Sequence, residues 1–235
     1  MASPRALVFD VFGTVVDWRG SIAREVEALA AQRGVSVDGA AFADRWRAGY
    51  KPAMDRVRRG DLPWMRLDAL HRMILDEILV GSPLEALDDA ARDDLDRVWH
   101  RLDPWPESVE GLLRLKRRFV VAPLSNGNFS LLTNLGRHAG LPWDCILSAE
   151  LFRHYKPDPE TYLGAADLLG IAPDALMLVA CHPDDLRAAR AVGLATGYVT
   201  RPLERGAGVA LPAVDDGEFD VVADDFIALD RLLGG

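Results

Sequence analysis

The chain has 235 residues with 27 Lys and Arg against 36 Asp and Glu, which gives a formal net charge of −9. This acidic balance argues against nucleic acid and anionic membranes as partners, and an anionic substrate would need a local basic pocket. Hydrophobic residues make up 49% of the chain, enough for a sizeable core, and no apolar stretch is long enough to span a bilayer.

The first feature along the chain is a short apolar run, residues 6–9, that ends at Asp10 and continues into Gly13 and Thr14. A strand that delivers a carboxylate into a Gly-Thr turn presents a nucleophile well. A carboxylate is already ionised at neutral pH, so it needs no general base to attack. The start of the chain, residues 1–5, lacks the pattern of a signal peptide.

Residues 18–100 show helical periodicity without strands, interrupted by polar, Gly or Pro breaks near Gly34, 60–63 and 81–83. After them, apolar strand-like runs recur at 119–124, 145–147, 176–180, 196–199 and 221–223, mostly separated by helical patterns, and 224–233 reads as a closing helix. We predict an α/β fold in which a doubly wound, Rossmann-like parallel sheet (1–16 and 101–235) carries an inserted helical cap (17–100).

Cys145 and Cys181 both lie in apolar, strand-like contexts. We interpret them as reduced thiols of a cytosolic protein, so a cytoplasmic location is expected.

Several polar residues follow predicted strands, where the working groups of open α/β sheets lie, and Lys156 lies just before the helix predicted to begin at Pro159. Segments far apart in the sequence are therefore expected to converge on one edge of the sheet. The residues concerned are Asp10, Ser125, Asn126, Lys156, Asp184 and Asp185.

These sites, in this order, resemble the haloacid dehalogenase superfamily and, within it, the 2-haloacid dehalogenases. The resemblance implies that Asp10 attacks the α-carbon of a small anionic 2-haloacid, expels halide and forms an aspartyl ester. Water then hydrolyses the ester to a 2-hydroxy acid, with no metal and no cofactor. Relatives are often dimers, so a homodimer is also expected.

Phe12 separates this reaction from phosphate-ester chemistry. In the superfamily's phosphatases the residue two after the nucleophile is usually an Asp that protonates the leaving oxygen. Halide leaves as a stable anion and needs no proton. Phe12 therefore favours carbon–halogen hydrolysis and is counted with the substrate-binding residues, although it could also simply pack under the cap.

The resemblance assigns further roles in the core. Ser125 would bind the substrate carboxylate and Asn126 would face the departing halide, with Thr14 also counted as substrate-binding. Lys156 would neutralise the crowded carboxylates and help to keep Asp10 ionised.

Two further residues carry open alternatives. Tyr162 either binds substrate or packs on its helix. Arg47 matches the cap arginine that receives halide, because a guanidinium presents several donors to an anion, and Arg45 is the competing candidate.

The segment 180–185 departs from the family pattern. Asp185 matches the carboxylate that helps to position and activate water. His182 falls where Asn is common, and it could serve as a general base or be structural. Asp184 replaces an aromatic that often lines the halide pocket, and we hypothesise a tighter, more polar pocket that favours fluoride.

The main alternative is a magnesium-dependent phosphatase of the same superfamily. Asp10, the carbonyl of Phe12, and Asp185 or Asp184 could bind the ion. A non-catalytic partner-binding protein on the same fold is a third class, and the presence of Asp10, Lys156 and Asp185 argues against it.

Overall fold

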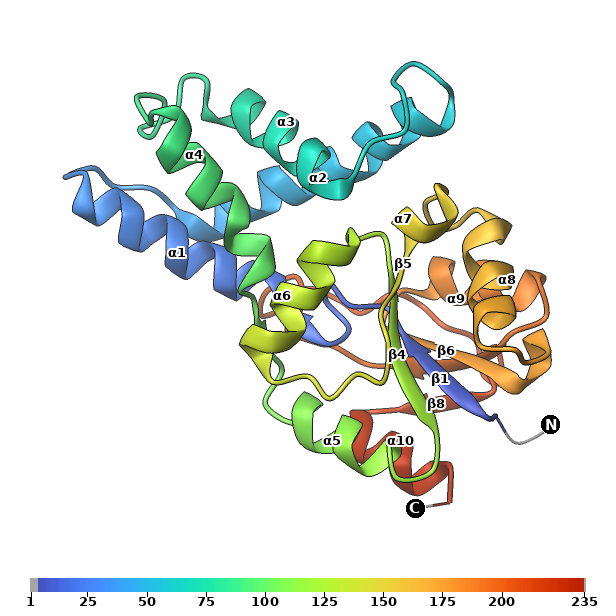
Figure 1. Ribbon diagram of the computed structural model, residues 1–235. Coiled ribbons are helices and arrows are strands. Elements are labelled where there is room, and N and C mark those ends of the chain that lie inside the picture. The colour runs from blue at the N-terminus through green and yellow to red at the C-terminus, as the bar shows by residue number, and fades with distance from the viewer. Residues whose placement is uncertain (1–3, 235) are drawn as a thin grey trace.

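The core of the computed structural model, which describes residues 4–234, is a six-stranded parallel sheet in the order β5-β4-β1-β6-β7-β8 (Figure 1). The inner strands are apolar on both faces, as expected for a sheet covered on both sides. The strands are β1 (Ala6–Phe9), β4 (Val120–Ser125), β5 (Leu147–Ser148), β6 (Leu176–Ala180), β7 (Ala195–Val199) and β8 (Val221–Ala223).

Two hydrophobic clusters lie on opposite faces of this sheet. Along β1, Leu7 and Phe9 belong to one cluster, whereas Ala6 and Val8 belong to the other. Helices α5 (Ser108–Leu115), α6 (Phe129–Ala139) and α10 (Phe226–Leu232) cover the first face, and α8 (Pro159–Leu168) and α9 (Pro183–Ala191) cover the second. The remaining short helices are α7 (Ala149–Phe152) and the 3₁₀ turn η2 (Pro173–Ala175). The predicted fold class is confirmed.

The stretch that was predicted to be all helical forms a layer of helices beside the sheet (Figure 1). The first three helices each end close to one of the breaks expected from the sequence. The elements are α1 (Trp18–Gln32), α2 (Gly39–Arg58), α3 (Leu67–Leu79), α4 (Asp89–Asp96) and the 3₁₀ turn η1 (Arg97–His100). We propose 17–100 as the extent of this cap.

Three local differences from the sequence-based prediction have physical causes. The two-residue strands β2 (Val16–Asp17) and β3 (Asp103–Pro104) pair antiparallel where the chain enters and leaves the cap, and they are too short to give a periodic pattern. The strand expected at 145–147 begins later, because the Asp144 carboxylate accepts a hydrogen bond from Val121 N at 2.9 Å and holds a loop. The last helix begins after Asp225, whose side chain caps it.

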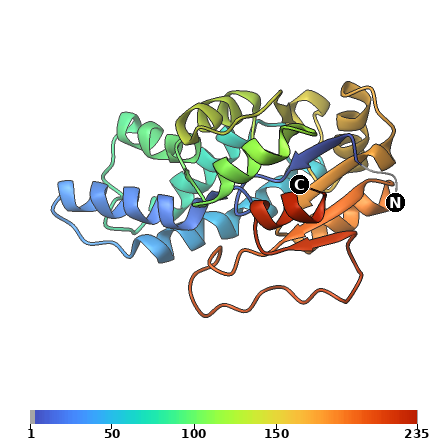
Figure 2. The ribbon, with the colours of Figure 1, turned by 90° about the horizontal axis from the view of Figure 1, so that it is seen from below.

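The connection between β7 and β8, residues 200–220, is a long irregular loop that the sequence analysis did not interpret (Figure 2). Arg201 anchors it: its Nε donates to the carbonyl of Thr14 at 2.8 Å, and its guanidinium pairs with Glu107 at 2.7 Å. This anchor brings the loop against the turn that follows β1.

None of the helices described here is both long and apolar enough to cross a membrane. Cys145 and Cys181 are free thiols, as expected. The prediction that a signal peptide is absent rests partly on residues 1–3, which lie outside the described residues.

The cap core contains an unusual buried histidine. The ring of His71 stacks on Trp99 at a centroid distance of 4.1 Å and meets Phe12 and Trp46 edge-on. Neither ring nitrogen has a hydrogen-bond partner within the part of the chain that the structure describes. Burial lowers the pKa of His71 to about 3, so the ring is neutral in the folded protein.

This histidine should make the fold acid-sensitive. Because its folded pKa lies below the ordinary value, the unfolded chain binds a proton first, and stability falls as pH drops from 6.5 toward 3. Between pH 7 and pH 4.5 this linkage costs about 2.5 kcal/mol. We therefore expect the free energy of unfolding, measured with denaturant, to fall between pH 7 and pH 4.5 by about this much more in the wild type than in His71→Phe. If the free energies of unfolding of the two proteins fell equally with pH, the low pKa assigned to His71 would be wrong.

Candidate active site

A cavity of about 710 Å³ lies at the carboxyl edge of the sheet, between the core and α2. The core contributes Asp10, Asn126, Lys156, His182 and Asp185; α2 contributes Arg47 and Tyr50; and the 200–220 loop contributes Glu204. The sequence-based prediction that distant segments converge at this edge is therefore confirmed for these core residues.

Asp10 is held by three donors. Its Oδ1 accepts from Lys156 Nζ at 3.0 Å, and its Oδ2 accepts from Thr14 Oγ1 at 2.8 Å and faces His182 Nδ1 at 3.0 Å. Burial raises the pKa of Asp10, but Lys156 and His182 outweigh burial and hold it far below its usual value. Asp10 is therefore a buried carboxylate that stays ionised.

Lys156 is buried between two carboxylates. Its Nζ also contacts Asp185 Oδ2 at 2.5 Å, and Tyr162 donates to Asp185 Oδ1 at 2.6 Å. Burial lowers the pKa of Lys156, but Asp10 and Asp185 raise it above its ordinary value, so the ammonium remains charged. Tyr162 thus fixes Asp185, and Asp185 in turn fixes Lys156.

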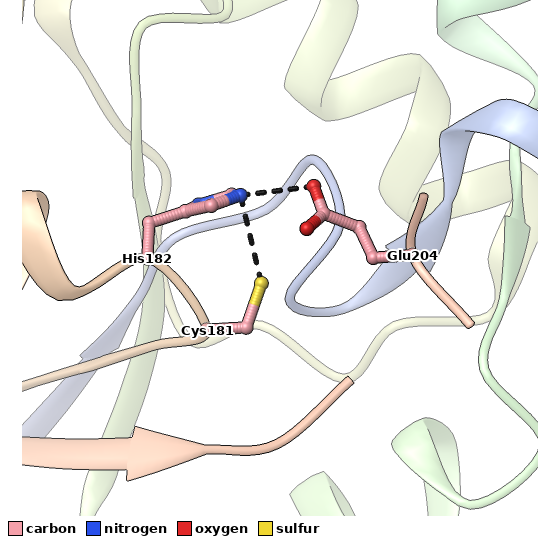
Figure 3. A group of neighbouring side chains, drawn as sticks. All are labelled: Cys181, His182 and Glu204. Atoms are coloured by element: carbon pink, nitrogen blue, oxygen red, sulfur yellow. Dashed lines mark hydrogen bonds and ion pairs between the residues drawn. The ribbon is translucent and has the colours of Figure 1, made fainter. Parts of the chain in front are cut away.

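His182 bridges two carboxylates. Besides Asp10 at Nδ1, its Nε2 lies 2.9 Å from Glu204 Oε1 and 3.6 Å from Cys181 Sγ (Figure 3). Burial lowers the pKa of His182, but Cys181, Asp10 and Glu204 hold it well above its usual value. With both nitrogens engaged, the ring is a donor to Asp10 in the unliganded protein rather than a ready base.

Sequence reasoning missed Glu204. It is buried, it accepts from Trp18 Nε1 at 3.2 Å, and His182 keeps its pKa low despite burial. It lies in a loop whose sequence matches no motif that we used. The only sequence signal for its role is the unusual histidine at 182, which needs a carboxylate partner to be charged.

Arg47 lines the cavity, whereas Arg45 is not among the described residues that line it. The Arg47 guanidinium lies over the Tyr50 ring at 4.3 Å and the Trp18 ring at 5.6 Å. Its Nη1 is buried and has no hydrogen-bond partner among the described residues, so it can receive a ligand. Arg45 is exposed and donates to the carbonyl of Ile78.

Four residues expected to contact substrate do not line the cavity in the described chain, and we propose supporting roles for them instead. Phe12 packs edge-on against Trp99 under the cap, at a centroid distance of 5.4 Å. Ser125 Oγ accepts from Gly127 N at 3.1 Å. Thr14 and Tyr162 are buried behind the carboxylates that they donate to. All four match the family motifs, but a motif does not show whether a residue contacts the substrate itself or supports another residue that does.

Comparison with known proteins identifies the family. A family model described as haloacid dehalogenase-like hydrolase matches residues 4–193. The chain belongs to this family. The (S)-2-haloacid dehalogenase 4A of Burkholderia cepacia is 30% identical over 210 residues, covering 85% of this chain and 84% of the relative. The resemblance inferred from the sequence motifs is confirmed.

Two solved structures of this hydrolase family are closely similar over nearly the whole chain. The defluorinating L-2-haloacid dehalogenase Rha0230 has a TM-score of 0.94 at 45% identity, covering 99% of this chain and 96% of that one. The L-2-haloacid dehalogenase PA0810 has a TM-score of 0.93 at 49% identity, covering 98% of each chain.

Proposed function

We propose that this hydrolase converts small 2-haloacids to 2-hydroxy acids through an ester on Asp10, without a metal or other cofactor. One observation carries the proposal: a single cavity holds an ionised carboxylate and, on α2, an arginine with an unpartnered buried Nη1. The names of the most similar relatives support the same reaction.

The first step is displacement at carbon. A carboxylate oxygen of Asp10 forms a bond to the substrate α-carbon, and the carbon–halogen bond breaks with its electron pair leaving on halide. Arg47 offers the anion several donors in a site shielded from water. The contacts of Asn126 Nδ2 with Met54 Sδ and with the Lys156 carbonyl are long, 3.4 Å each, so it can turn a hydrogen toward substrate.

The second step is hydrolysis of the ester. Esterification removes the negative charge of Asp10, so His182 loses one of the two carboxylates that hold its proton. Glu204 remains at Nε2 and can take up that proton. The neutral imidazole can then accept a proton from water that attacks the Asp10 carbonyl carbon. The bond between this carbon and the ester oxygen breaks, and the departing oxygen takes up the second proton of that water to give the hydroxy acid. The Asp10 carboxylate re-forms beside protonated His182, and Glu204 releases its proton to solvent. The general-base role expected for His182 thus belongs to the ester intermediate in this proposal.

The phosphatase alternative has less support from the geometry. The two carboxylates that it needs as magnesium ligands, Asp10 and Asp185, already share the ammonium of Lys156. The side chain of Asp184 is 93% exposed and pairs with Arg187. Phe12 offers no acid for a leaving alkoxide.

The direct test compares two substrates. We expect halide release from chloroacetate to persist in excess EDTA, with little phosphate release from a generic phosphate ester in magnesium. Magnesium-dependent phosphate release without halide release from any 2-haloacid would favour the phosphatase.

We also propose that the pocket accepts fluoride. One relative at 45% identity is described as defluorinating, and Arg47 presents hydrogen-bond donors suited to a small, hard anion. Fluoroacetate should release fluoride at a rate measurable with an ion-selective electrode and absent from Asp10→Ala. If the protein released chloride from chloroacetate but no fluoride from fluoroacetate, the proposal that the pocket accepts fluoride would be wrong.

Exchanging the two cap arginines for lysine tests the anion receptor. Arg47→Lys keeps the charge but loses the planar fork, so kcat/KM should fall by about 100-fold. Arg45→Lys, in an exposed position on the same helix, should be nearly neutral. The reverse pattern would assign halide binding to Arg45.

A cytoplasmic location and a homodimer remain part of this proposal. The two free thiols agree with a reducing compartment. Size-exclusion chromatography with light scattering tests the dimer.

A further inference from the structure

We propose that Cys181, His182 and Glu204 form a binding site for a zinc-class divalent cation, and that the bound ion inhibits the enzyme. The site itself is independent of the proposed function, whereas the inhibition rests on it. The three residues offer sulfur, nitrogen and oxygen ligands whose atoms all lie within 4.8 Å of one another (Figure 3).

The spacing suits tetrahedral coordination. Zn–S bonds of about 2.3 Å and Zn–N bonds of about 2.0 Å at a tetrahedral angle place sulfur and nitrogen about 3.5 Å apart. Cys181 Sγ and His182 Nε2 are 3.6 Å apart. Glu204 Oε1 is nearer to Nε2, at 2.9 Å, because the two form a hydrogen bond that the ion would replace.

The surroundings of the histidine also match a metal ligand. Metal-bound histidines almost always donate their other ring N–H to a carboxylate or carbonyl. His182 Nδ1 already faces Asp10 Oδ2 at 3.0 Å, so Nε2 can exchange its hydrogen bond to Glu204 for the ion without disturbing that contact. His182 and Glu204 line the cavity, which gives the ion a way in and supplies water or an anion as fourth ligand.

The ligand set selects the metal. Thiolate and imidazole favour zinc and cobalt over magnesium, which prefers oxygen ligands. Binding displaces the Cys181 thiol proton and the proton on His182 Nε2, so the ion's two positive charges replace two protons. The coordinated Glu204 can then no longer take up the proton of His182, and His182 can no longer accept one from water, so hydrolysis of the ester should stop.

Cobalt gives a readout that does not depend on activity. Co²⁺ added to the tag-free enzyme should produce a thiolate-to-cobalt charge-transfer band that saturates at one equivalent and is displaced by Zn²⁺. Cys145→Ala should keep the band, because Cys145 is the other thiol and is not part of the cluster. Cys181→Ser, with folding checked by circular dichroism, should lose the band and bind zinc about 100-fold more weakly.

Each result bears on the site or on the inhibition. Absence of the band in the wild type, or its persistence in Cys181→Ser, would overturn the site. Loss of the band in Cys145→Ala would do the same. Zn²⁺ should inhibit halide release from chloroacetate by the wild type and Cys145→Ala, reversibly with EDTA. Undiminished halide release with the site saturated by Zn²⁺ would overturn the inhibition. If the protein proved to have no dehalogenase activity, the cobalt band would still test the metal site.

Discussion

Asp10→Ala should reduce halide release by at least about 10⁴-fold, because the variant has no carboxylate to attack the substrate carbon. The variant should still fold. Lys156 keeps Asp185 as its partner and His182 keeps Glu204, so neither buried cation is left without a carboxylate. Halide release by initial rate and thermal unfolding by circular dichroism measure the two effects separately.

Asp184→Asn is the matched control. Asp184 lies at the same cavity, but its carboxylate is exposed and pairs with Arg187, an interaction of small energy. This variant should turn over at nearly the wild-type rate. Substantial activity in Asp10→Ala, or equal losses in both variants, would show that another group attacks the substrate.

Glu204→Gln should slow hydrolysis of the ester by about 10²- to 10³-fold while leaving its formation intact. Glutamine fills the same space but cannot take up the proton of His182. Mixing enzyme and chloroacetate should give a burst of one halide per active site followed by slow turnover. Intact-protein mass spectrometry should show an adduct equal to the substrate less its halide, and His182→Ala should accumulate the same adduct.

Glu218→Gln supplies the control from the same loop. Glu218 pairs with Arg187 on the surface rather than with a residue of the cavity, so its substitution should leave the kinetics unchanged. If both Glu204→Gln and His182→Ala turned over steadily without an adduct, the roles of Glu204 and His182 would be structural.

The sheet and cap could be predicted from the sequence because their signals are long and periodic. The apolar run before Asp10 gives β1, and the uninterrupted helical periodicity gives the cap. The antiparallel pair β2 and β3 could not be predicted, because two residues per strand carry no alternation. The loop at 200–220 carries no periodic pattern either, and its path depends on tertiary contacts of Arg201.

The site was predictable as far as its motifs reached. Asp10 follows β1, Lys156 precedes α8 and Asp185 lies in the first turn of α9, so topology alone brings them together. Glu204 was missed because it reaches the site from an irregular loop. The protonation state of His182 could not be predicted for the same reason, since its pKa depends on Glu204 as well as on Asp10.

A single turnover in water enriched in ¹⁸O tests the central claim most directly. With enzyme in excess over chloroacetate, the new oxygen of the product should come from Asp10, so the product should be unlabelled. Water attacks the Asp10 carbonyl, so one ¹⁸O should appear in the peptide that contains Asp10. Label in the first-turnover product, with none on Asp10, would mean that water attacks the substrate directly and would contradict the ester mechanism.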